Sequence, residues 1–140
     1  MEATWQNSID ELNVRREAAL AGGGQDRIAK QHTSGKLTAR ERMEALFDDD
    51  TFVEINDLIT SRATDFGMDK KKKPGDGVVT GYGYIHGRIA FAASQDFTVG
   101  GGSLGEAQAM KICRVMDKAL DMRAPFISIN DSGGARIEEE

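Results

Sequence analysis

The chain has 140 residues and a formal net charge of −5, with acidic and basic side chains mixed along its length. This length allows one domain with a modest core, and the mixed charge argues against a nucleic-acid groove, which needs a basic face. No apolar stretch is long enough to span a bilayer, the N-terminus has no signal-peptide core, and the single cysteine fits a reducing cytoplasm.

The N-terminus has the periodicity of a helix. Ser8 with Glu11 predicts a capping box, and three glycines at 22–24 end the helix. The apolar residues that recur at helical spacing are Trp5, Ile9, Leu12 and Ala19.

Two shorter helices are expected next. The first runs from Asp26 to His32, and Gly35 ends it. Thr38 with Glu41 predicts a capping box that opens the second, which ends near Phe47. The acidic residues at 48–50 are adjacent and lack the spacing of a calcium loop, so we assign no metal site there. Residues 1–50 are therefore predicted to be an N-terminal helical region.

The middle of the chain predicts strands over 51–55, 78–85 and 88–95. His86-Gly87 fits a two-residue hairpin turn between the last two better than it fits a catalytic base. Residues 57–74 have no clear period and are expected to be mobile. Within them, Lys70–Lys73 are interpreted as a solvated loop, with a contact to an anionic ligand such as a nucleotide phosphate as the alternative.

A long helix is predicted over 104–122, followed by a strand over 126–130. Ser103 with Glu106 forms the capping box that opens it, and Pro125 prevents its continuation. Cys113 lies on the apolar stripe, which favours a buried small hydrophobe over a nucleophile. Strand, helix and strand in this order predict a parallel pair of strands. The predicted core-facing stripe consists of Ala109, Ile112, Cys113, Met116, Ala119 and Leu120.

The stretch Phe126–Arg136 carries the main functional signal. An isoleucine-rich run ends in a glycine turn at 132–134, and Ala135 begins a predicted helix. Strand, glycine turn and helix N-terminus together direct backbone N–H donors at one point, which suits a developing oxyanion. On these residues alone a plain tight turn is the simpler interpretation. A second glycine loop, Phe97–Ser103, also follows an apolar run, and two such loops can supply two donors to one carbonyl oxygen.

Four blocks of the chain resemble one family, in order: Asp76–Gly83, Ser94–Val99, Gly101–Glu106 and Asn130–Ile137. The family is that of the carboxyltransferase subunits of biotin-dependent acyl-CoA carboxylases and decarboxylases, which includes propionyl-CoA carboxylase beta chains and methylmalonyl-CoA decarboxylase alpha chains. Gly35–Arg42 resembles the N-terminal helical region of this family, so the resemblance covers nearly the whole chain.

The resemblance implies an α/β, crotonase-like fold, with residues 51–140 as the first part of an N-terminal acyl-CoA carboxyltransferase domain. It implies transfer of a carboxyl group between carboxybiotin and the α-carbon of an acyl-CoA, with biotin rather than a side chain accepting the proton. The backbone of Gly133, Gly134 and Ala135 would form the oxyanion hole for the thioester enolate. The residues that would line the acyl-CoA cleft are Phe97, Thr98, Val99, Gly100, Gly101, Gly102 and Ser103.

The resemblance also implies partners: a biotin carboxyl carrier, with either a biotin carboxylase or membrane decarboxylase subunits, and a homo-oligomer at full length. Family members are several times longer and commonly have glycine where Arg123 and Glu140 stand. We therefore expect a truncated N-terminal fragment that is inactive alone, with a non-catalytic remnant or assembly piece as the alternative. A CoA thioester hydratase is a further alternative, but it lacks a suitably placed glutamate pair. The acyl chain and the direction of the reaction stay open.

Overall fold

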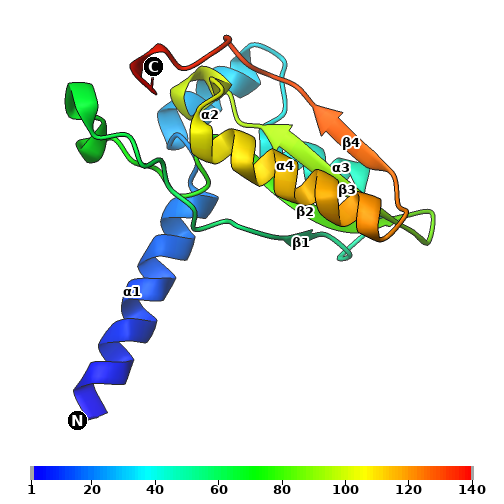
Figure 1. Ribbon diagram of the computed structural model, residues 1–140, viewed down its shortest axis with the longest axis horizontal. Helices are drawn as coiled ribbons and strands as arrows, with labels where there is room; N and C mark the ends of the chain where they lie inside the picture. The colour runs from blue at the N-terminus through cyan, green and yellow to red at the C-terminus, as the bar shows by residue number, and fades with distance from the viewer. Residues whose placement is uncertain (1, 140) are drawn as a thin grey trace.

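The computed structural model describes residues 2–139, which form a four-stranded sheet with helices on both faces (Figure 1). The helices are α1 (Glu2–Leu20), α2 (Gln25–Thr33), α3 (Ala39–Leu46) and α4 (Glu106–Asp121). The strands are β1 (Val53–Glu54), β2 (Val78–Ile85), β3 (Arg88–Gln95) and β4 (Phe126–Ile129). Short 3-10 helices are η1 (Asp65–Lys70), η2 (Gly100–Gly102) and η3 (Ile137–Glu139). The predicted order of helices and strands is confirmed, although β1 is shorter than the predicted 51–55.

The sheet has the order β1-β2-β3-β4, with β4 parallel to β3 and the other pairs antiparallel. The predicted hairpin turn is confirmed, because His86 and Gly87 have φ of 49° and 75°, as a two-residue turn of this kind requires. The Asp48 carboxylate accepts the N–H groups of both turn residues, each at 2.9 Å. Asp48 therefore stabilises the hairpin.

Two apolar clusters lie on opposite faces of the sheet. Side chains alternate along a strand, so Ala92 of β3 packs toward α3 while Phe91 packs toward α4. The cluster under α3 contains Ala39, Met43, Phe47, Val79, Ala90 and Ala92. The cluster under α4 contains Val78, Phe91, Ala93, Val115 and Ala119.

Of the two capping boxes predicted in the N-terminal helical region, the one at Thr38 is confirmed and the one at Ser8 is wrong. Thr38 Oγ1 accepts the N–H of Glu41 at 3.2 Å, and the Glu41 carboxylate accepts the N–H of Thr38 at 2.8 Å. The capping box at Ser8 does not form, because α1 already includes Glu2 and the Ser8 hydroxyl donates to the Thr4 carbonyl inside the helix. As Figure 1 shows, α1 extends away from the sheet and its flanking helices.

The predicted capping box and apolar stripe of α4 are also corrected. Gly105 is the N-cap residue and provides no side-chain cap, while the Ser103 hydroxyl donates to the Gly100 carbonyl at 2.8 Å. Cys113 is exposed rather than buried. The stripe is confirmed at Ala119, which is buried, and at Ile112, which packs against the cluster under α4. It is wrong at Cys113, Met116 and Leu120, which are exposed, and it missed the buried polar residues Gln108 and Lys111. The buried residues of α4 are Ala107, Gln108, Lys111, Val115 and Ala119.

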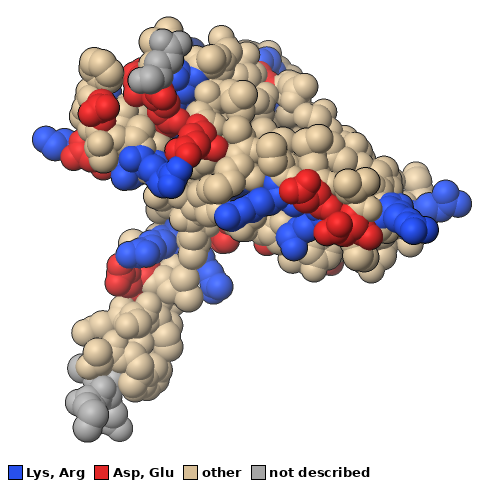
Figure 2. All heavy atoms as spheres, in the orientation of Figure 1, with Lys and Arg blue, Asp and Glu red and all other residues tan. Residues whose placement is uncertain are grey.

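Charged side chains of both signs are interspersed on the face that Figure 2 shows, as the composition predicts. Among residues 2–139, the helices all lack the combination of length and apolar character that crossing a membrane requires.

Candidate functional site

The two glycine loops meet at one edge of the sheet. Strands β3 and β4 are parallel, so the loops that follow them leave from the same edge. The Gly133 N–H donates to the Gly101 carbonyl at 2.9 Å, and the Leu104 N–H donates to the Gly134 carbonyl at 2.8 Å. The Arg136 N–H then donates to the Leu104 carbonyl at 2.9 Å. These bonds form a short parallel ladder that joins the loops.

Close contact between the two loop backbones explains why residue 102 is a glycine. A Cβ atom on Gly102 would lie 2.2 Å from the carbonyl oxygen of Asp131, which no real side chain tolerates. Glycine at 102 therefore allows the backbones of the two loops to touch.

The backbone N–H groups of residues 133–135 differ in whether they have a hydrogen-bond partner. Gly133 donates to Gly101, and Gly134 donates to the Ser132 hydroxyl at 3.1 Å. Within the described residues, the N–H of Ala135 has no hydrogen-bond partner. The N–H and C=O of a trans peptide point in opposite directions. Because the Gly134 carbonyl is fixed on Leu104, the Ala135 N–H points away from that contact.

Gly134 holds this peptide in place with an unusual conformation. Its φ is +127°, which side-chain-bearing residues rarely adopt, and a Cβ there would meet nothing within 4 Å. The requirement for glycine is thus one of backbone conformation and not of space.

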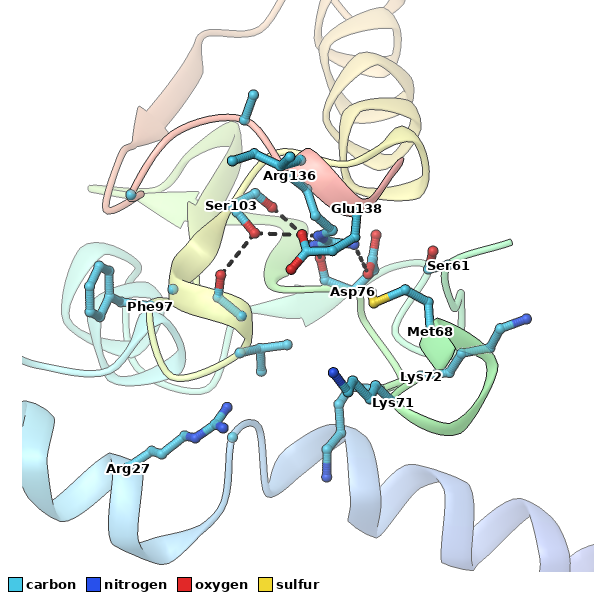
Figure 3. Close-up of a pocket in the computed structure, with 18 of the residues that line it drawn as sticks. Arg27, Ser61, Met68, Lys71, Lys72, Asp76, Phe97, Ser103, Arg136 and Glu138 are labelled. Atoms are coloured by element: carbon cyan, nitrogen blue, oxygen red, sulfur yellow. Dashed lines mark hydrogen bonds and ion pairs between the residues drawn. The ribbon is translucent and has the colours of Figure 1, made fainter. Parts of the chain in front are cut away.

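An open cleft of about 650 Å³ lies where the loops meet (Figure 3). Of the sequence-predicted site residues, the lining includes Phe97, Val99, Gly100, Gly101, Ser103, Gly133 and Ala135. Thr98 is buried and instead faces the helical region, where its hydroxyl accepts the N–H of Gly23 at 3.0 Å. Gly102 and Gly134 do not line the cleft but shape the backbone beside it.

Basic side chains from two other parts of the chain line the same cleft. Lys70–Lys73 come from the segment around η1, and Arg27 comes from α2. Figure 3 shows Arg27 and Lys71 across the cleft from Ser103 and Arg136. This placement favours the anionic-ligand alternative for Lys70–Lys73 over a plain solvated loop. The sequence contained no signal for Arg27, because only the fold brings α2 to this edge.

A buried ion pair forms one wall of the cleft. Arg136 Nη1 lies 2.7 Å from Asp76 Oδ1 and 2.8 Å from Glu139 Oε1, and Nη2 donates to the Ser103 carbonyl at 3.0 Å. Burial raises the pKa of Asp76, while its hydrogen bond to Arg136 opposes the shift. The predicted helix beginning at Ala135 is wrong, since only the 3-10 helix η3 follows. The N–H of Ala135, which has no partner among the described residues, therefore belongs to the turn and not to a helix N-terminus.

A family model described as the carboxyl transferase domain matches residues 30–140, and the chain belongs to this family.

Two curated relatives give the similarity in numbers. The propionyl-CoA carboxylase carboxyltransferase subunit of Haloferax mediterranei is 57% identical over 136 residues, which are 97% of this chain and 26% of the relative. The methylmalonyl-CoA decarboxylase subunit alpha of Veillonella parvula is 54% identical over 98% of this chain and 27% of the relative. The chain thus spans about a quarter of the length of these relatives.

A crystal structure supports the fold directly. Transcarboxylase 12S, solved as a hexamer assembly with methylmalonyl-coenzyme A and methylmalonic acid bound, matches with a TM-score of 0.91 at 50% identity. The match covers 97% of this chain and 27% of that one. The predicted crotonase-like fold is confirmed.

Proposed function

We propose that this chain forms the acyl-CoA side of a carboxyltransferase that moves a carboxyl group between carboxybiotin and the α-carbon of an acyl-CoA. The observation that carries the proposal is the Ala135 N–H, which has no partner within residues 2–139 and lies at a cleft shared by both glycine loops. The names of the relatives support a short acyl-CoA of the propionyl or methylmalonyl type as substrate.

The reaction requires charge stabilisation at one oxygen. When the α-carbon of the thioester loses its proton, negative charge develops on the carbonyl oxygen, and preorganised N–H donors lower the energy of that state. We assign this role to the turn Gly133–Ala135, with the Ala135 N–H as the donor that is free to act. The N–H groups of Gly100 and Gly101, which also lack partners within the described residues, are the candidates for a second donor. Carboxybiotin, brought by a biotin carboxyl carrier, supplies the carboxyl group.

The basic edge of the cleft fits the other end of the substrate. Coenzyme A carries phosphates, and exposed lysine and arginine side chains attract them as charges with hydrogen-bond donors. Arg27 and Lys70–Lys73 line the cleft, and Figure 3 shows Arg27 and Lys71 on the side opposite Ser103 and Arg136. We therefore assign them to the phosphates of the acyl-CoA.

We assign three kinds of partner to the protein that contains this chain. These are a biotin carboxyl carrier, either a biotin carboxylase or membrane decarboxylase subunits, and further copies of itself. The hexamer assembly of transcarboxylase 12S supports the last of these.

A chimera tests the proposal. This chain would replace the matching 136-residue segment of the Haloferax mediterranei subunit, and carboxyl transfer from carboxybiotin to propionyl-CoA would be measured. We expect turnover comparable to that of the unaltered subunit. A folded chimera that binds propionyl-CoA without carboxylating it, or that hydrates unsaturated thioesters instead, would contradict the proposal.

A further inference from the structure

The carboxylate of Asp131, at the start of the turn that leads to Ala135, is held by the N-terminal helical region. Its oxygens accept hydrogen bonds from Gln31 Nε2 at 3.1 Å, Lys36 Nζ at 2.9 Å and Arg42 Nη2 at 2.8 Å. The Asp131 side chain is only 10% exposed. Three donors from α2, α3 and the segment between them therefore converge on one acidic side chain far away in the sequence.

The backbone of Asp131 is connected through hydrogen bonds to the other glycine loop, residues 97–103. Its N–H donates to Gln95 Oε1 at 3.1 Å, and Gln95 Nε2 donates to Gln108 Oε1 at 3.3 Å. Gln108 is fully buried and donates to the Ser103 carbonyl at 3.0 Å. A continuous chain of hydrogen bonds thus runs from the helical region through Asp131 to the second loop.

Lys36 also connects Asp131 to the loop 97–103 through a second contact, with Phe97. Its ammonium group lies 5.1 Å from the ring centroid of Phe97, within the range of a cation–π contact. The cation that binds Asp131 therefore also contacts the loop that lines the other side of the cleft.

Besides the backbone bonds of Gly133 and Gly134, the turn is anchored at both of its ends. Residues 132–135 are all exposed, whereas Asp131 is held by partly buried charge-assisted bonds and Arg136 by a buried one. Such bonds are about twice as strong as neutral ones. The position of the Ala135 N–H is therefore set jointly by the backbone bonds to Gly101 and Leu104 and by the two anchored ends of the turn.

We propose that Asp131 is a positioning residue through which the helical region 25–46 fixes the turn 132–135 against the loop 97–103. The inference rests on the proposed function only for its effect on turnover, since the positioning itself is a property of this chain. The N-terminal helices would then belong to the machinery of the cleft, although within residues 2–139 they form no hydrogen bond with Ala135.

Hydrogen exchange on the 140-residue chain tests the positioning without any assay of activity. In Asp131→Asn, two N–H groups that fix the turn, those of Gly133 and Arg136, should exchange roughly tenfold to a hundredfold faster, in line with the loss of charged hydrogen bonds. The matched control is Glu54→Gln, which breaks the Arg40–Glu54 ion pair between α3 and β1. It should lower stability without affecting these two amides selectively.

Two results would overturn the inference: unchanged exchange at Gly133 in a folded Asp131→Asn, or an equal increase in Glu54→Gln. If Asp131→Asn does not fold, Arg42→Met removes one of the three bonds and should give a smaller change in the same direction. No selective change at Gly133 in Arg42→Met would also count against the inference.

Turnover in the chimera provides the functional readout. Asp131→Asn should lower kcat roughly tenfold or more with little change in KM, because a displaced donor affects the transition state more than ground-state binding. A similar loss in Glu54→Gln would overturn the positioning role. If the unsubstituted chimera transfers no carboxyl group, the proposed function fails while the exchange result still decides the inference.

Discussion

Lys111 is a fully buried cation that clamps the turn before β2. Its ammonium group donates to the carbonyl oxygens of Gly75 at 2.8 Å and Val78 at 2.5 Å, and its exposure is 0%. Burial lowers the pKa of Lys111 to about 8, against the opposing effect of nearby carboxylates that include Glu54 and Asp76. The lysine is thus held in the interior by two carbonyl groups rather than by an adjacent carboxylate.

This pKa predicts a pH dependence of stability. Between pH 8 and 10.5 the unfolded chain binds a proton at Lys111 that the folded chain has lost, so the free energy of unfolding gains a rising contribution as pH increases. Lys111→Met should abolish that contribution, and it should also cost about 1–3 kcal/mol by removing the Lys111 donor from the Val78 carbonyl, whereas the Gly75 carbonyl keeps the N–H of Val78. Urea unfolding at several pH values measures both effects.

Lys118→Met, at an exposed position of the same helix, is the control and should keep the wild-type slope. An identical pH dependence in wild type and Lys111→Met would show that Lys111 does not titrate in this range.

The lysines at the edge of the cleft predict a substrate-specific effect. In the chimera, Lys71→Gln with Lys72→Gln should raise KM for propionyl-CoA by about threefold to tenfold, the range expected for partly exposed charge contacts. Propionyl-pantetheine lacks the nucleotide phosphates, so its KM should not change. Equal effects on both substrates, or the same effect from Lys118→Gln, would show that these lysines do not bind the phosphates.

Among the secondary-structure elements, α4 ends with a residue in an unfavourable conformation. Arg123 has φ of 51°, and its N–H donates to the Leu120 carbonyl at 3.1 Å while the Ala124 N–H donates to the Ala119 carbonyl at 2.9 Å. This pair of bonds is the Schellman motif, in which glycine is strongly preferred at the position of Arg123. The glycine that family members commonly have at position 123 fits this geometry.

Arg123→Gly should therefore raise the free energy of unfolding by about 1 kcal/mol, because it relieves a left-handed conformation at a side-chain-bearing residue. Arg114→Gly is the matched control, since Arg114 is exposed within the same helix and glycine there should destabilise by about 1 kcal/mol. Chemical denaturation of both variants provides the comparison. Destabilisation by Arg123→Gly would contradict the assignment.

The sequence predicted those elements whose signals are local. The Thr38–Glu41 capping box, the His86-Gly87 turn and the strands around it depend on residues a few positions apart, and all are confirmed. The α4 stripe was only partly right, because apolar periodicity cannot show that Gln108 and Lys111 find buried carbonyl partners in other segments. Cys113 was misplaced for the same reason.

Across the whole molecule, the backbone of the site could be predicted but most of its side chains could not. The two glycine loops were recognised from strand, turn and spacing, and the structure brings them into contact. Arg27, Asp131 and Arg136 act through partners 60 to 100 residues away, as the separations in their bonds show. Local periodicity carries no information on such pairs. The assignment of residues 1–50 and 51–140 as two regions stays a prediction.

The most direct test of the central claim is the turnover of the chimera with Gly134→Val. Valine strains the backbone at φ of +127° and should displace the Ala135 N–H, so kcat should fall about a hundredfold to a thousandfold while KM rises little. Gly87→Val is the control, because Gly87 also has a positive φ and open surroundings but lies in the β2–β3 hairpin turn. It should lower stability and leave kcat nearly normal. A Gly134→Val chimera that is well folded by circular dichroism and retains near-normal kcat would contradict the account and reduce the turn to a structural feature.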